Sequence, residues 1–192
     1  LLGEQFYFDI PIYKLFVDEK EANFWRQKSN EPQLFEWISH KIEHPFNQTY
    51  LDHKFGAAKT LKSGYLQTAK WLNHFREFLK KSNSFLGSTF DYNKIEFKEN
   101  GVTWNGYEAK QIIFCEGYQS IYNPYFKWLP FKLTKGEVLT VKFENLKLDS
   151  AINKGVFVLP YNNNYKLGAT YNWDELNENT SVEGKEELLK KA

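Results

Sequence analysis

The chain has 192 residues and a formal net charge of +1, from 25 basic and 24 acidic side chains. This balance argues against a nucleic-acid or anionic-lipid partner, and no apolar run approaches the roughly 20 residues of a membrane-spanning helix. The single cysteine, Cys115, excludes an intramolecular disulfide. Together with the absence of a secretory leader pattern, it leads us to expect a cytoplasmic protein.

The N-terminal third is predicted to mix strands and helices. Gln5–Val17 is strand-like, and Pro11 within it indicates either an edge strand or a break between two strands. Asp18 and Glu21 form a capping-box pattern that predicts a helix over Glu19–Lys28.

A second helix is expected over Gln33–Ile42, because Leu34, Trp37, Ile38 and Ile42 recur near helical spacing and Pro45 follows. Residues 46–62 show no strong periodicity, so we interpret them as a connection between domains.

The middle of the chain predicts a helix followed by an antiparallel meander. Thr68 begins the helix, whose apolar residues Leu72, Phe75 and Leu79 share one face. Three strand-like segments follow, joined by turns at Gly101 and at Asn105-Gly106. Asn-Gly between alternating segments is a strong hairpin signal.

The meander leads into the apolar block Ile112–Cys115, closed by Glu116-Gly117. Its β-branched and aromatic residues predict a buried strand. Burial would raise the pKa of the Cys115 thiol and make it unreactive, so we expect a structural cysteine.

The C-terminal third is rich in predicted strands. They cover Val138–Phe143, Lys147–Ile152, Val156–Leu159 and Tyr165–Tyr171. The last two are joined at Asn162-Asn-Asn164, because asparagine tolerates the left-handed backbone of a tight hairpin. A second capping box, Thr180 with Glu183, predicts a helix at the C-terminal end.

Residue patterns of common catalytic and metal sites are weak. His40 and His44 stand four apart, but Pro45 ends the expected helix, so we predict no metal site. Ser120 lacks the glycines of a nucleophile elbow. The aromatic clusters Tyr118–Trp128 and Phe157–Trp173 have two interpretations, a core with a substrate-binding sheet or a stacking surface for bases or sugars, and we favour the first.

Four segments resemble one family in their order and spacing. They are the block ending at Gly117, Lys135-Gly136-Glu137 with its strand, Gly155–Pro160, and Gly168-Ala-Thr at the end of the hairpin. This series resembles the FAD-dependent amine and amino-acid oxidoreductases of the glycine oxidase and D-amino-acid oxidase type. The resemblance is best from about Lys62 to Leu189.

The resemblance implies a cofactor, a substrate class and site residues. FAD would accept hydride from an amine or amino-acid-like substrate in the full-length protein. Cys115, Glu116, Gly117, Gly136 and Glu137 would lie along the cofactor, and Tyr161 and Thr170 would face the substrate. The catalytic residues and the oligomeric state are not specified. The resemblance also implies that the arginine that pairs with a substrate carboxylate lies beyond residue 192.

The expected fold is α+β. Residues 1–61 and 125–192 would form a substrate domain, a mixed or antiparallel sheet with flanking helices. Residues 62–124 would be the remnant of a Rossmann-like FAD domain with a β-meander.

The sequence contains neither methionine nor a Gly-x-Gly-x-x-Gly motif. The missing methionine leads us to expect a piece of a longer protein. The resemblance implies that its pyrophosphate-binding turn lies upstream, so this chain is not expected to retain FAD by itself. The alternative is a non-enzymatic α+β module that binds peptide or glycan through its aromatic residues.

Overall fold

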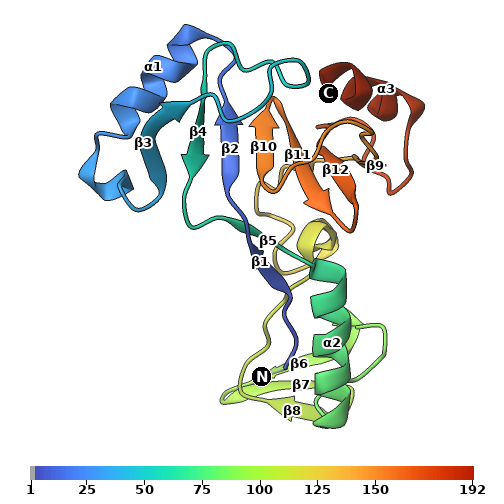
Figure 1. Cartoon of the computed structure of the whole chain (residues 1–192). Helices are drawn as coiled ribbons and strands as arrows, with labels where there is room; N and C mark the ends of the chain where they lie inside the picture. Colours follow the sequence, from blue (N-terminus) through green and yellow to red (C-terminus); the bar gives the residue numbers. More distant parts are fainter. Residues whose placement is uncertain (1–2) are drawn as a thin grey trace. The chain divides into compact units, whose positions relative to one another are not determined.

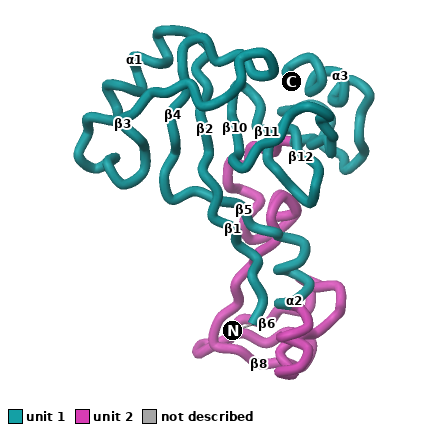
Figure 2. Tube along the Cα trace, in the orientation of Figure 1, with its two compact units in different colours: residues 1–75, 135–192 teal, residues 76–134 magenta. Residues whose placement is uncertain are grey.

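The computed structural model describes residues 3–192 and has an α+β fold, as predicted (Figure 1). The chain divides into two compact units (Figure 2). Unit 1 comprises residues 1–75 and 135–192, of which residues 1 and 2 lie outside the described part; unit 2 comprises residues 76–134. The sequence-derived domain boundaries at 61/62 and 124/125 stay a prediction.

Unit 1 is built on a seven-stranded mixed sheet with the strand order β3-β4-β2-β10-β11-β12-β9. All neighbouring strands are antiparallel except β2 and β10, which are parallel. The strands are β2 (Ile12–Leu15), β3 (Ile38–Glu43), β4 (Ala57–Thr60), β9 (Val138–Val141), β10 (Ala151–Lys154), β11 (Val156–Tyr161) and β12 (Asn164–Gly168). A separate two-stranded ribbon joins β1 (Tyr7–Asp9) to β5 (Gly64–Leu66).

One face of this sheet, the core face, forms the main hydrophobic core. Tyr13, Leu15, Ile152, Val158 and Leu167 point to it, because successive side chains of a strand alternate between the two faces. Helix α3 (Val182–Lys191) contributes Leu188, which is fully buried in the same cluster.

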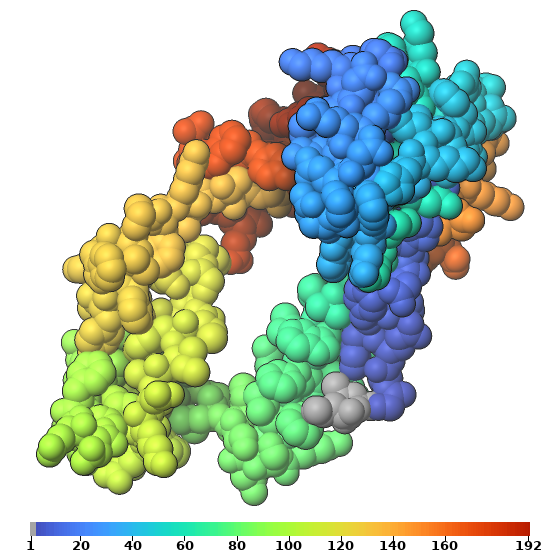
Figure 3. All heavy atoms as spheres, turned by 90° about the vertical axis from the view of Figure 1, so that its left-hand side faces the viewer, coloured from blue at the N-terminus to red at the C-terminus, as the bar shows by residue number. Residues whose placement is uncertain are grey.

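Helix α1 (Glu19–Lys28) packs on the opposite face over β2, β3 and β4. Ala22 is fully buried with Phe16 and Ala58, and Trp25 donates its Nε1–H to the carbonyl of Ser39 at 2.9 Å. Figure 3 shows the side chains of α1 beside those of the β3 segment. The helix has its predicted bounds, and Asp18 Oδ1 accepts from Glu21 N at 2.7 Å, as a capping box requires.

Unit 2 contains the predicted meander. Strands β6 (Ile95–Lys98), β7 (Gly101–Trp104) and β8 (Tyr107–Ala109) pair in antiparallel order, and Asn105 adopts the left-handed backbone of its turn. The ring of Phe114 packs against Phe90, Tyr92, Tyr125 and Phe126, with centroid separations of 5.8–6.1 Å. Helix α2 (Thr68–Lys81) begins in unit 1 and ends in unit 2. Short 3-10 helices at Pro32–Leu34, Tyr92–Lys94 and Gly117–Tyr122 complete the elements.

Three expectations were wrong. Only Pro32–Leu34 is helical in the segment expected as a second helix, and its second half is strand β3. Residues 46–62, expected to be a connection, contain strand β4, whose Ala57 and Ala58 are fully buried.

The third error is the buried strand at Ile112–Cys115. Within the described part of the chain these residues pair with no strand, Ile113 is 81% exposed, and Cys115 is exposed. A strand requires a neighbouring strand as well as apolar residues, and the sequence pattern reports only the latter.

Candidate functional site

The half of the sheet that α1 leaves uncovered presents a polar and aromatic surface, which we call the open face. It consists of the side chains of β9–β12 that alternate with the core residues: Thr140, Asn153, Phe157, Leu159, Tyr161 and Lys166. These side chains are half-buried or exposed, whereas Ile152, Val158 and Leu167 on the core face are at most 7% exposed. The open face is therefore one surface of unit 1 that presents hydrogen-bonding and aromatic groups side by side.

A glycine allows the open face to form a tight row. Gly168 pairs with Phe157 on one side and Val138 on the other. A Cβ atom at Gly168 would lie 3.0 Å from Phe157 Cζ and 2.9 Å from Val138 Cγ2, closer than side chains normally approach. The Gly-Ala-Thr sequence thus lets the Phe157 ring lie across the adjacent strand.

Lys166 is the basic group of this surface. Its Nζ donates to Thr140 Oγ1 at 2.7 Å and lies 5.5 Å from the centroid of the Tyr161 ring. The Tyr161 ring in turn contacts Tyr65 of β5 edge-on at 6.0 Å, and Tyr65 stacks on Phe8 of β1 at 5.1 Å. A cation and several aromatic faces therefore lie together in unit 1.

The predicted site residues Gly136, Glu137 and Thr170 lie close together. Glu137 N donates to Thr170 Oγ1 at 2.9 Å, and a Cβ at Gly136 would lie 3.3 Å from the Thr170 carbonyl oxygen. Thr170 is 4% exposed. Its hydroxyl is thus engaged within the protein.

The carboxylate of Glu137 holds the start of α3. Its Oε2 accepts from Ser181 N at 2.8 Å, its Oε1 accepts from Ser181 Oγ at 2.7 Å, and Lys135 Nζ lies 3.4 Å away. The hydrogen bonds from Ser181, supported by Lys135, lower the pKa of Glu137. A cofactor contact from Lys135-Gly136-Glu137 would therefore come from backbone atoms.

Cys115, Glu116 and Gly117 lie in unit 2, where Gly117 has φ +57° and open space around its Cα. The Glu116 carboxylate accepts from Tyr92 Oη and from Asn123 Nδ2, the latter at 2.7 Å. The hydrogen bond to Glu116 raises the pKa of Tyr92. Cys115 and Gly117 are exposed, contrary to the expected burial of the cysteine.

Two of the cavities in the described part of unit 1 bear on the site. The larger, about 600 Å³, is on the core face among apolar residues of β2, β10 and β11, and none of the predicted site residues lines it. The smaller, about 350 Å³, includes Glu137 and Thr170 in its wall.

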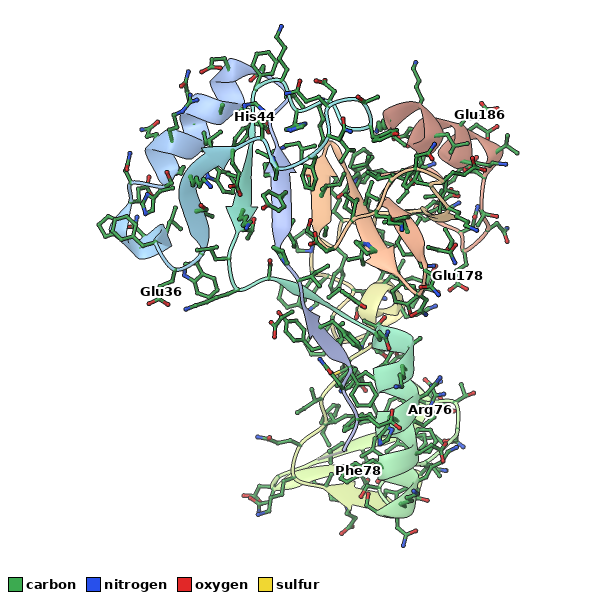
Figure 4. All side chains as sticks on the ribbon, viewed as in Figure 1. Glu36, His44, Arg76, Phe78, Glu178 and Glu186 are labelled. Carbon is green, nitrogen blue, oxygen red and sulfur yellow. The ribbon has the colours of Figure 1, made fainter. Side chains whose placement is uncertain are left out.

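The histidine pair is part of a strand region. His40 lies in β3, and His44, labelled in Figure 4, follows this strand directly. The helical spacing expected for the two histidines therefore does not apply. Residues 3–192 bring no three potential His, Cys, Asp or Glu metal ligands together. In the same range, no helix combines the length and the apolar character needed to cross a membrane.

Comparison with known proteins adds one similarity. No protein-family model matches the chain. Among solved structures, the chain is similar to glycine oxidase from Geobacillus kaustophilus, with a TM-score of 0.77, 96% of this chain covered and 16% sequence identity. The fold is glycine oxidase-like. At this identity the likeness shows the fold alone, and the chain spans about half of that protein, 53% of its length.

The resemblance found in the sequence is therefore confirmed at the level of the fold. Of the residues that it implied, Tyr161 lies on the open face. Lys166, Phe157 and Thr140 share that face and were not among the residues that the resemblance implied. A signal for Lys166 exists in the sequence, since it stands between the apolar residues Tyr165 and Leu167 of a predicted strand. A charged residue there identifies the face that does not enter the core.

Proposed function

We propose that the chain is part of an FAD-dependent oxidoreductase that oxidises an amine or amino-acid-like substrate. The observation that carries the proposal is the likeness to glycine oxidase over 96% of the chain. The open face supports it, because a small polar substrate needs a few hydrogen-bonding groups beside apolar or aromatic walls. FAD, when bound, supplies the hydride acceptor, and the protein positions the substrate and excludes side reactions.

The residues of unit 2 predicted to contact FAD fit that role in part. Gly117 offers an exposed backbone with no side chain in the way. The Glu116 carboxylate is already bonded to Tyr92 and Asn123, so it would hold the turn and leave the contact to the neighbouring backbone. In unit 1, we propose that Tyr161 and Phe157 form the substrate wall.

The test is a spectroscopic one on the natural full-length protein that contains this chain. It should purify with the visible spectrum of oxidised flavin, and anaerobic addition of a small amino acid should bleach that spectrum. Reoxidation by oxygen should restore it. A full-length protein that purifies colourless and binds no added FAD would contradict the proposal.

A matched pair of variants tests the Gly117 contact. Gly117→Val should lower FAD occupancy, because a branched side chain would stand where the cofactor approaches. Gly106→Val is the control, since Gly106 also has a positive φ (+84°) and open surroundings in the same unit. Equal occupancy in the two variants would show that Gly117 is a turn residue only.

The alternative is a non-enzymatic module that binds peptide or glycan. The exposed aromatic side chains of unit 2 favour it, among them Trp128 at 74% and Tyr122 at 69% exposure. Under this alternative, a colourless protein would bind oligosaccharides or peptides and lose that binding on Trp128→Ala.

A further inference from the structure

Three two-residue hairpin turns in the described part of the chain contain asparagine. They are Glu99-Asn100 between β6 and β7, Asn105-Gly106 between β7 and β8, and Asn162-Asn163 between β11 and β12. All of these asparagines are exposed. An exposed asparagine loses its amide when the backbone nitrogen of the next residue attacks the side-chain carbonyl carbon. The residue that follows, and the freedom of its backbone N–H group, therefore decide which turn reacts.

In the β7–β8 turn the attacking nitrogen is free. Trp104 pairs with Tyr107 across the turn, so the N–H of Tyr107 closes it, and Gly106 N lies one residue earlier. Gly106 has φ +84°, and an added Cβ would meet nothing within 4 Å, so the space beside its backbone is open. The side-chain oxygen of Asn105 accepts from Lys94 Nζ at 3.5 Å, longer than a typical hydrogen bond. The amide nitrogen, which is the leaving group, takes no part in this contact.

The β6–β7 turn also contains an Asn-Gly pair, but its glycine occupies another position. Gly101 is the first residue of β7 and pairs with Lys98 across the turn. The residue in that position donates its backbone N–H to the carbonyl of its partner. The nitrogen that would attack Asn100 is therefore held in the turn.

The β11–β12 turn has the right geometry without the glycine. Asn162 occupies the same turn position as Asn105, and both have φ +48°. The residue that follows is Asn163, with φ +61°, where the β7–β8 turn has Gly106. The Cβ of Asn163 crowds the nitrogen that would attack, whereas a glycine leaves it accessible.

We propose that Asn105 is a site of spontaneous deamidation in the folded protein, and that Asn100 and Asn162 are protected. Gly106 N forms a bond to Asn105 Cγ, the bond from Cγ to the side-chain nitrogen breaks, and that nitrogen leaves as ammonia with the proton of Gly106 N. Water then opens the succinimide at either carbonyl and gives aspartate or isoaspartate, with no oxidation or reduction. The modification is independent of the proposed function, because all of its atoms lie in one turn.

The experiment follows deamidation of the natural full-length protein at mildly alkaline pH, both folded and in denaturant. One tryptic peptide, Glu99–Lys110, carries both Asn-Gly pairs, so fragment masses compare Asn100 with Asn105 directly. In the folded protein Asn105 should react about tenfold faster or more, because Gly101 N becomes free only after its hydrogen bond opens. In denaturant the two asparagines should react at similar rates.

A reciprocal pair of variants tests the role of the glycine. Gly106→Asn should protect Asn105, and Asn163→Gly should make Asn162 a new site of deamidation. Both variants keep their turns, because asparagine and glycine each tolerate a positive φ.

Four results would overturn the proposal. The first is equal reaction of Asn100 and Asn105 in the folded protein. The second is an Asn105 that stays intact in the folded protein while the denatured protein is converted. The third is conversion of Asn105 at an unchanged rate in Gly106→Asn, and the fourth is an Asn162 that stays intact in Asn163→Gly.

Discussion

Glu137 shows how one side chain can serve the fold at a position where the motif resemblance led us to expect a cofactor contact. Its carboxylate accepts two hydrogen bonds from Ser181, and Ser181 Oγ in turn accepts from Gly184 N. The negative charge also lies at the positive end of the α3 dipole. Glu137 therefore connects strand β9 to the start of α3, whatever its backbone contacts elsewhere.

This connection predicts a pH dependence of stability. The pKa of Glu137 is lowered in the folded state, so the carboxylate stabilises the fold above its ordinary pKa of 4.5 and loses that effect as the pH falls through the lowered value. Glu137→Gln should flatten the decline of the melting temperature below about pH 4.5. Glu186→Gln, an exposed glutamate in the middle of the same helix, is the control and should change the decline less than Glu137→Gln.

In unit 2, the buried polar residue Asn123 holds the carboxylate of Glu116 by a hydrogen bond. It is fully buried, donates to Glu116 Oε2 at 2.7 Å and accepts from Tyr125 N at 2.9 Å. Asn123→Ala leaves Tyr125 N unpaired and removes one donor to Glu116, so we expect a loss of about 1–3 kcal/mol in the free energy of unfolding, measured with denaturant. A loss under about 0.5 kcal/mol would mean that water replaces both bonds.

At the scale of elements, local signals predicted three of the four expected helices, and the hairpins of the meander. The helix beginning at Thr68, the helix Glu19–Lys28 and the meander all form, because caps, turns and periodicity act within a few residues. The terminal helix forms with Ser181, one residue after the expected cap, as its N-cap.

The wrong predictions concern segments whose structure depends on pairing with a strand that is distant in the sequence. Ile38 and Ile42 share a helical face, but residues four apart also share one face of a strand. Pairing with β4 selects the strand. No spacing within Gln33–Ile42 could reveal that partner, which lies about twenty residues further along the chain.

Helix α3 offers a prediction from two adjacent leucines. Leu188 is fully buried in the core cluster, whereas Leu189 is 51% exposed. Leu188→Ala should lower the free energy of unfolding by about 2–5 kcal/mol through lost contacts and a cavity. Leu189→Ala should change it by less than about 0.5 kcal/mol. Similar losses in both variants, measured by denaturant titration, would contradict the packing of α3 on the sheet.

At the scale of the whole molecule, the sequence predicted the kind of fold better than the site. The order of short motifs indicated an oxidase-like fold, and the structural similarity to glycine oxidase agrees with that prediction. The open face could not be derived in the same way, because it depends on which strands α1 covers and which it leaves exposed. That choice is made by the strand order β4-β2-β10, which joins segments more than ninety residues apart.

The last prediction concerns cofactor retention by the 192-residue chain. In dinucleotide folds FAD is held chiefly by its pyrophosphate, through backbone N–H groups at a glycine-rich helix N-terminus. This sequence has no Gly-x-Gly-x-x-Gly. Hydrogen bonds from the Cys115–Gly117 backbone, each worth about 0.5–1.5 kcal/mol, do not offset an association cost of roughly 4–15 kcal/mol.

We therefore expect the chain, expressed alone with excess FAD and then freed of unbound cofactor, to lack the visible flavin spectrum. The full-length protein, treated in the same way, is the positive control and should keep it. A stoichiometric yellow complex of the 192-residue chain would show that the main anchor of the cofactor lies within it. The core and open faces of the sheet would then have to be searched for that anchor, beginning with the cavity of about 600 Å³.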